Sequence, residues 1–122
     1  YIQYAHARIC SILRQAEEDS VYCPPAATAD LHLLQTEAEI DLMKRLAQLP
    51  EEIIWAAERR EPHRIARYCH ELASSFHSFY THCRVLGEDE ALQGARLVLL
   101  KATRQVLQIA LRTLGVAAPE RM

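Results

Sequence analysis

The sequence predicts an all-α fold: a bundle of about five helices followed by a short non-helical tail. Apolar residues recur at spacings of three and four in several segments of helical length, and no segment alternates as a half-buried strand would. Proline and glycine residues separate these segments, and the connections are short apart from a loop at 19–35. With 122 residues, half of them hydrophobic, the chain is expected to form one domain over residues 1–122.

The first predicted helix covers about residues 1–17. Its inward stripe consists of Ile2, Ala5, Ile9, Ile12, Leu13 and Ala16. Tyr4 and Arg8 lie on one flank of this helix, together with Tyr1. Two interpretations of that flank stay open: a packed helix edge whose arginine pairs with a neighbouring acid, or a surface on which nucleotide bases stack.

Two shorter helices are predicted in the middle of the chain. Thr36 and Glu39 have the spacing of a capping box, which predicts a helix over about residues 37–48. Pro50 suits the first turn of a third helix. We expect the apolar residues of that third helix to face inward, namely Ile53, Ile54, Ala56 and Ala57.

The fourth predicted helix begins at Pro62 and continues to about Arg84. Its inward face consists of Ile65, Tyr68, Cys69, Leu72, Phe76, Phe79 and Cys83. Tyr80 falls on the margin of that stripe. Spacing alone favours an edge aromatic that holds the helix to its neighbours.

The longest helix is predicted after Asp89, which can cap its start, and Gly115 suits its left-handed end. The apolar face expected for it is Leu92, Ala95, Leu99, Ala102, Val106, Ile109 and Ala110. Because this face is wide, we expect the helix to be the centre of the packing. Past Gly115 the chain leaves the helix and continues as a tail to Met122.

Charge is unevenly distributed, although the net charge is only −2. Residues 17–61 hold eleven acidic residues against four basic ones, whereas residues 62–122 hold eight basic residues against five acidic ones. If a polyanion binds this chain, we therefore expect it to meet the first and last helices and to avoid the middle. No run of eighteen apolar residues occurs, so no membrane span is predicted.

The sequence predicts neither a metal site nor a catalytic residue. The four cysteines lack the paired spacing of a zinc site, and we interpret them as reduced, mostly buried thiols. Cys69 and Cys83 fall on the apolar side of their helix, whereas the neighbouring histidines point away, so these ligands would not converge. Phosphate-binding loops, zinc-protease motifs and nucleophile elbows are likewise missing from the sequence.

Several stretches are informative through their exact residues as well as through their helical periodicity. They are YIQYAHARICSI at 1–12, ELA at 71–73, FHSFY at 76–80, ATRQVL at 102–107 and LGVAAPERM at 114–122. In this order and spacing they resemble the first helix, the fourth helix, and the closing helix and tail of the carboxy-terminal DALR-type anticodon-binding domain of arginyl-tRNA synthetase. The region 21–61 adds nothing to the resemblance.

The resemblance implies a carboxy-terminal fragment of a longer, cytoplasmic synthetase. That parent would be a class I arginine–tRNA ligase that uses ATP and Mg, but neither a HIGH-like nor a KMSKS-like motif occurs in this chain. The fragment would therefore be non-catalytic and would need no cofactor of its own. Its implied partners are the anticodon loop of arginine tRNA and the synthetase's catalytic domain, with no membrane and no second copy of the chain, so that the protein is a monomer.

The resemblance also implies an anticodon site. Tyr80 and Met122 would accommodate unstacked bases, Arg8 would contact the loop, and Tyr4 and Arg121 would lie beside them. For Arg8 and Tyr80 this reverses the preference for a packing role. Met122 would supply an apolar wall beside a terminal carboxylate that can accept a hydrogen bond from a base amino group.

Two other functions stay open. The same amphipathic helices would suit a helical protein-interaction module. A related class I synthetase, such as that for cysteine or methionine, also carries a helical anticodon domain, although the PERM ending at 119–122 disfavours this alternative.

Overall fold

The computed structural model describes all 122 residues, as five α-helices and one short 3₁₀ helix without any strand. The elements are α1 (Ile2–Glu18), η1 (Leu31–Leu33), α2 (Glu37–Ala47), α3 (Leu49–Arg59), α4 (His63–His82) and α5 (Glu90–Thr113). A non-helical tail, residues 114–122, follows α5. The predicted all-α bundle with a tail is confirmed, and η1 is an addition within the predicted loop at 19–35.

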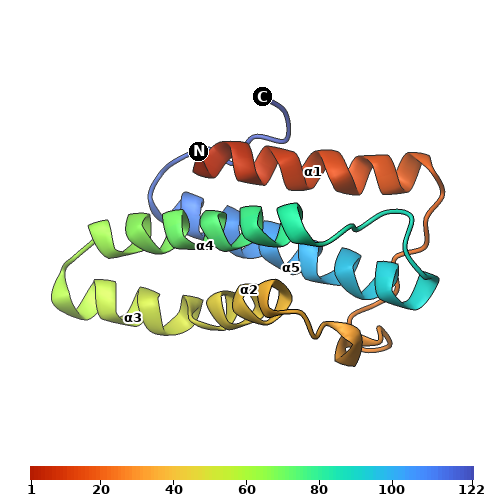
Figure 1. Cartoon of the computed structure of the whole chain (residues 1–122). Helices are drawn as coiled ribbons and strands as arrows, with labels where there is room; N and C mark the ends of the chain where they lie inside the picture. The colour runs from red at the N-terminus through yellow and green to blue at the C-terminus, as the bar shows by residue number, and fades with distance from the viewer.

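The helices form three layers, with α1 on one side, α4 and α5 in the middle, and α2 and α3 on the other side (Figure 1). Helix α4 packs against each of the four other α-helices, whereas the main contacts of α5 are with α1, α2, α4 and η1. The prediction that the last helix alone is the centre of the packing is therefore wrong. The two middle helices share that role. None of the helices has the length and apolar character that crossing a membrane requires.

The inward face predicted for α4 is confirmed, because all seven of its residues are buried. The face predicted for α5 is partly wrong: Ile109 is exposed, and the buried positions include Leu97, Leu100 and Leu107. The apolar face of α5 is wide, although Lys101, Gln105 and Gln108 form a polar stripe beside it, so spacing alone did not fix which apolar residues meet α1 and α4. In α3, Ile54 is 54% exposed and Ala57 is exposed, because this outer helix meets the bundle mainly through α4.

The local signals for helix ends are largely confirmed. Thr36 and Glu39 form the capping box at the start of α2, and Pro50 lies in the first turn of α3. Gly115 adopts a left-handed φ of 73° just past α5. Asp89 occupies the N-cap position of α5, but its side chain makes no capping hydrogen bond. The four cysteines are free, and all but Cys23 are buried, as predicted.

One buried ion pair joins the layers. Glu39 in α2 is fully buried, and its Oε2 accepts a hydrogen bond of 2.9 Å from Nε of Arg96 in α5. Its Oε1 accepts from the backbone N and the hydroxyl of Thr36, at 3.1 and 2.8 Å. Arg96 Nη1 also donates to the carbonyl of Arg84, just after α4, at 2.6 Å. The pair therefore connects α2, α5 and the end of α4, and the sequence analysis did not anticipate it.

Replacing Glu39 by glutamine is expected to lower the free energy of unfolding by about 3 kcal/mol, because Arg96 would remain buried without its counter-charge. Urea denaturation at neutral pH measures this change. The double substitution Glu39→Leu with Arg96→Met, which removes both charges, is the control and should recover much of the loss. An unchanged urea midpoint for Glu39→Gln would show that the pair contributes nothing.

The ion pair of Glu39 and Arg96 also predicts that the fold loses stability at acidic pH. Burial disfavours the charged form of Glu39, but hydrogen bonds from Arg96 and Thr36 outweigh it and lower the pKa below its ordinary value of 4.5. A depressed carboxyl pKa stabilises the fold above the unfolded-state value, and this contribution is lost as pH falls through the folded-state value. Unfolding free energy measured from pH 6 to pH 3 should therefore fall less steeply in Glu39→Gln than in the unmodified chain.

Candidate nucleic-acid interface

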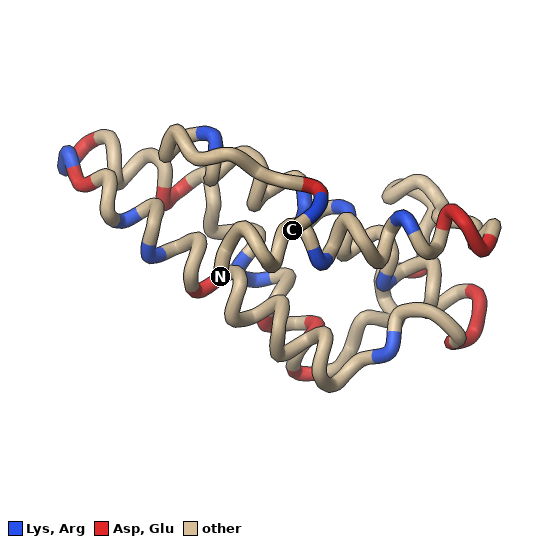
Figure 2. Tube along the Cα trace, turned by 90° about the horizontal axis from the view of Figure 1, so that it is seen from above, with Lys and Arg blue, Asp and Glu red and all other residues tan.

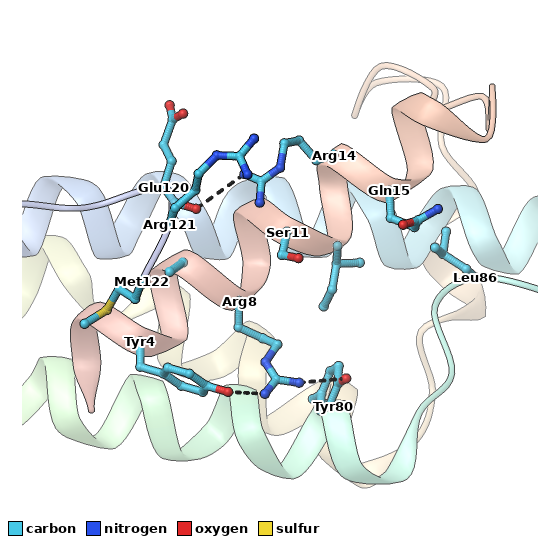
Figure 3. Close-up of a pocket in the computed structure, with 12 residues that line it drawn as sticks. Tyr4, Arg8, Ser11, Arg14, Gln15, Tyr80, Leu86, Glu120, Arg121 and Met122 are labelled. Carbon is cyan, nitrogen blue, oxygen red and sulfur yellow. Dashed lines mark hydrogen bonds between the residues drawn. The ribbon is translucent and has the colours of Figure 1, made fainter.

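A groove of about 520 Å³ lies between α1, the end of α4 and the tail, and we call it the aromatic groove (Figure 3). It is lined by Tyr4, Ala7, Arg8, Ser11, Ile12, Arg14 and Gln15 of α1, Tyr80 of α4, Leu86, and Glu120, Arg121 and Met122 of the tail. All five residues predicted for the site, Tyr4, Arg8, Tyr80, Arg121 and Met122, line this one groove. The fold thus brings together residues from both ends of the chain.

Arg8 is held between two tyrosines. Its Nη1 donates to the Tyr80 hydroxyl at 2.9 Å, and its Nη2 donates to the Tyr4 hydroxyl. The guanidinium carbon lies 5.0 Å from the Tyr80 ring centroid and 5.1 Å from that of Tyr4. The hydrogen bonds that Arg8 donates to Tyr4 and to Tyr80 raise the pKa of its guanidinium above the ordinary value. No carboxylate pairs with Arg8, so this cation faces the groove without a counter-charge.

The apolar surfaces of the groove are open to a ligand. Tyr4 and Tyr80 are 43% and 42% exposed, and Met122 is 76% exposed. The Tyr80 ring contacts the buried Phe76 ring at 6.0 Å between centroids, which fixes one side of it against α4. Large apolar side chains left open on a surface that also carries unpaired cations are typical of a binding site.

The aromatic surface continues beyond the groove along α1 and α4. The Tyr1 ring lies 4.9 Å from that of His70 and 5.1 Å from that of His77, and Tyr4 stacks on His77 at 6.5 Å. Partial burial and then the charge of Arg8 lower the pKa of His77. The sequence analysis placed the histidines beside Cys69 and Cys83 away from the apolar side of their helix, and the structure shows that His70 and His77 pair with the tyrosines of α1.

Three side chains of α1 hold the tail. Gln3 Nε2 donates to the Ala117 carbonyl at 2.9 Å, and Arg14 Nη1 donates to the Glu120 carbonyl at 3.4 Å. His6 is 2% exposed, and its Nδ1 donates to the Pro119 carbonyl at 2.8 Å. This interaction defines the tautomer, because a carbonyl can only accept. The remaining nitrogen, Nε2, has no hydrogen-bond partner and is the only such buried side-chain atom in the structure.

Sequence reasoning missed His6. Its position beside Ala5 and Ile9 in the inward half of the first helix was the available signal, because a buried imidazole needs a partner. The partner, however, is a tail carbonyl 113 residues away. By holding Pro119, His6 places the following residues at the edge of the aromatic groove.

Exposed tyrosines around an arginine that no carboxylate pairs with are typical of sites that bind unstacked bases of single-stranded nucleic acid. Here such a site lies on the surface of an all-α bundle. The family model described as the DALR anticodon binding domain matches residues 2–122. The chain therefore belongs to the DALR anticodon-binding domain family.

The individual proteins that this chain resembles are consistent with the family match. The chain is 58% identical over 122 residues to the arginine–tRNA ligase of Symbiobacterium thermophilum and 56% identical to that of Moorella thermoacetica, covering 100% of this chain and 22% of each ligase. It resembles the solved arginyl-tRNA synthetase of Thermus thermophilus with a TM-score of 0.85 at 36% identity, over 100% of this chain and 21% of that one. It also resembles the solved structure of a putative arginyl-tRNA synthetase from Campylobacter jejuni, with a TM-score of 0.86 at 30% identity, over 100% of this chain and 26% of that one. The chain thus spans about a fifth of the length of the ligases it matches.

The tail's attachment through His6 can be tested by its backbone mobility in solution. Substitution His6→Ala is expected to cost about 1 kcal/mol of stability and to lower the nuclear magnetic resonance order parameters of the backbone amides around Pro119, because the Pro119 carbonyl loses its buried donor. Gln3→Ala, which removes an exposed tether to the same tail, is the matched control and should have a smaller effect. If the order parameters of the tail are the same in His6→Ala as in the unmodified chain, His6 does not hold it.

Proposed function

We propose that this chain is the anticodon-binding domain of an arginine–tRNA ligase and that its aromatic groove holds the anticodon loop of arginine tRNA. One observation carries the proposal: Tyr4, Arg8 and Tyr80 form a hydrogen-bonded cluster at an open groove, in a chain that matches arginine–tRNA ligases along its whole length.

The chemistry of the groove suits a loop of single-stranded RNA. Such loops are recognised by splaying their bases onto aromatic faces, and stacking contributes about 1–3 kcal/mol per base. Tyr80 supplies a face fixed against α4, and Met122 supplies an adaptable apolar wall. Arg8 supplies donors for base edges or phosphates, and Arg121 adds a second cation at the tail edge of the groove.

We further infer that the chain works within a longer class I ligase whose catalytic domain activates arginine with ATP and Mg. The domain would position the tRNA and would need no cofactor of its own. Its partners would then be arginine tRNA and that catalytic domain, in the cytoplasm, with the ligase acting as a monomer. The chain covers only about a fifth of the length of each relative, which supports the inference that a separate domain carries the catalytic activity.

Tyr80→Ala is expected to weaken binding of an RNA hairpin carrying an arginine anticodon loop by about 1–3 kcal/mol, or roughly 5- to 150-fold in Kd. Fluorescence anisotropy with the 122-residue chain measures this, and a hairpin with a scrambled loop is the RNA control. Tyr80→Phe keeps the ring and loses only the hydroxyl that accepts from Arg8, so it should retain most of the affinity. Equal binding of both hairpins by the unmodified chain would overturn the proposed function.

Met122→Ala should act in the same direction, because the apolar wall of the groove is lost. In the full-length ligase it is expected to lower kcat/KM for tRNA in aminoacylation while leaving the binding of arginine and ATP unchanged. Because Met122 is exposed, the melting temperature of the domain should not change. Wild-type charging kinetics, or a loss of activity that follows a lower melting temperature, would contradict a role in tRNA binding.

A further inference from the structure

His77 lies behind the wall of the aromatic groove, on the side of α4 that meets α1. Its ring centroid is 5.1 Å from that of Tyr1 and 6.5 Å from that of Tyr4, and the planes of His77 and Tyr4 are inclined by 25°. His77 is partly buried and is not among the residues that line the groove. It therefore contacts a groove residue without forming part of the groove surface.

The contact with Tyr4 places His77 in a network of four side chains. His77 and Tyr80 lie one turn apart on α4, and Tyr4 and Arg8 lie one turn apart on α1. His77 stacks on Tyr4, whose hydroxyl accepts a hydrogen bond from Arg8. Arg8 also donates to the hydroxyl of Tyr80, whose ring contacts that of the buried Phe76. His77 thus supports the ring of Tyr4 as Phe76 supports the ring of Tyr80.

The charges that act on His77 are cationic. Partial burial is the largest cause of its lowered pKa, and the Arg8 guanidinium and the amino group of Tyr1 lower it further. No acidic residue occurs in α1 before Glu17, so the charged positions along this helix are basic up to its acidic end (Figure 2). The neutral form of His77 is therefore favoured near neutral pH in the free protein.

The other titratable groups of α4 do not offset these cations. His70 contacts the Tyr1 ring at 4.9 Å between centroids and is exposed. Glu71 is the one acidic residue of α4, and its carboxylate forms an ion pair with Arg45 of α2. No carboxylate is thus available to His77 from its own helix or from the part of α1 that it contacts.

A bound RNA loop would bring the negative charge that this environment lacks. A phosphate beside Arg8 would offset the repulsion between that guanidinium and a proton on His77, and would raise the pKa of His77. The faces of Tyr1 and Tyr4 also stabilise a cation that lies against them. Binding of the loop and protonation of the imidazole would therefore favour one another, as linkage requires.

We propose that His77 is a positioning residue for Tyr4 and that binding of the anticodon loop draws a proton from solvent onto its ring. The inference rests on the proposed function, because the loop supplies the negative charge. The ring holds Tyr4 for stacking in either protonation state. A histidine whose pKa is higher in the complex strengthens binding as the pH falls through that pKa.

The proton uptake can be measured directly. Nuclear magnetic resonance titration of the His77 ring protons gives the pKa in the free chain and in its complex with an RNA hairpin that carries an arginine anticodon loop. The amino group of Tyr1 is acetylated in both samples, so that its own titration does not contribute. We expect a higher pKa in the complex. The same pKa in both samples would overturn the proton uptake.

The affinity for the same hairpin should show the same linkage. Kd is expected to fall about three- to tenfold between about pH 7.5 and pH 5.5, because uptake of one proton changes Kd by at most about tenfold per pH unit. In His77→Gln, which cannot titrate, Kd should change far less. The matched control is His63→Gln, an exposed histidine fourteen residues earlier on α4 and about 21 Å away along the helix. This control should keep the pH dependence of the unmodified chain.

The positioning role has a separate readout. His77→Ala removes the ring behind Tyr4 and is expected to raise Kd roughly two- to tenfold at about pH 7.5. His77→Phe returns a ring and should recover most of that loss, but not the pH dependence. Circular dichroism checks that both variants keep their helices. An unchanged Kd in His77→Ala, or a loss that His77→Phe does not recover, would overturn the positioning of Tyr4.

Failure of this inference can be distinguished from failure of the proposed function. If the unmodified chain binds arginine and scrambled loops equally, the anticodon assignment is wrong whatever the pH dependence. If the chain prefers the arginine loop but His77→Gln keeps the pH dependence of the unmodified chain, only the role of His77 is wrong.

Discussion

The buried pair of Glu39 and Arg96 is the interaction on which the arrangement of the helices depends. A charge in the interior is tolerated only when it is paired and its other hydrogen-bonding atoms are satisfied. Both oxygens of Glu39 have partners, and Arg96 also holds the carbonyl of Arg84. This fixes α2 against α5 and secures the chain just beyond α4, four residues after Tyr80. The connection that follows the Tyr80 end of α4 is therefore tied to a charge pair in the core.

The distribution of ion pairs divides the molecule into two halves. Apart from the buried pair, every ion pair lies among α2, α3, α4 and the α3–α4 connection: Arg45 with Glu71, and Arg64 with Glu52 and Glu61. The acidic middle of the chain is thus partly neutralised by its own neighbours. Around α1, the tail and the exposed side of α5, the cations have no such partners. The bundle therefore presents one surface whose positive charge is available to a polyanion, despite a net charge of −2.

Sequence reasoning worked where the signal was local and failed where it depended on distant residues. The capping box at Thr36, the left-handed Gly115 and the face of α4 were predicted because neighbouring residues determine them. The face of α5 was partly mistaken because the apolar face of that helix is wide, and the packing of neighbouring helices decides which of its residues are buried. Arg8 and Tyr80 came from family resemblance, since spacing alone favoured packing. The contact of His6 with Pro119 joins residues far apart in sequence, so no local pattern contains it.

The aromatic groove combines a rigid wall with an adaptable one. Tyr4, Arg8 and Tyr80 project from helices anchored by fully buried residues such as Ile9 and Phe76, so their geometry is set before any ligand arrives. The tail has no regular structure and is held to α1 by side-chain hydrogen bonds, which cost far less to break than a packed helix. A ligand can therefore shift Met122 without disturbing the core. Fitting an irregular loop then requires rearrangement of the tail alone, and the tyrosines keep the orientation that stacking requires.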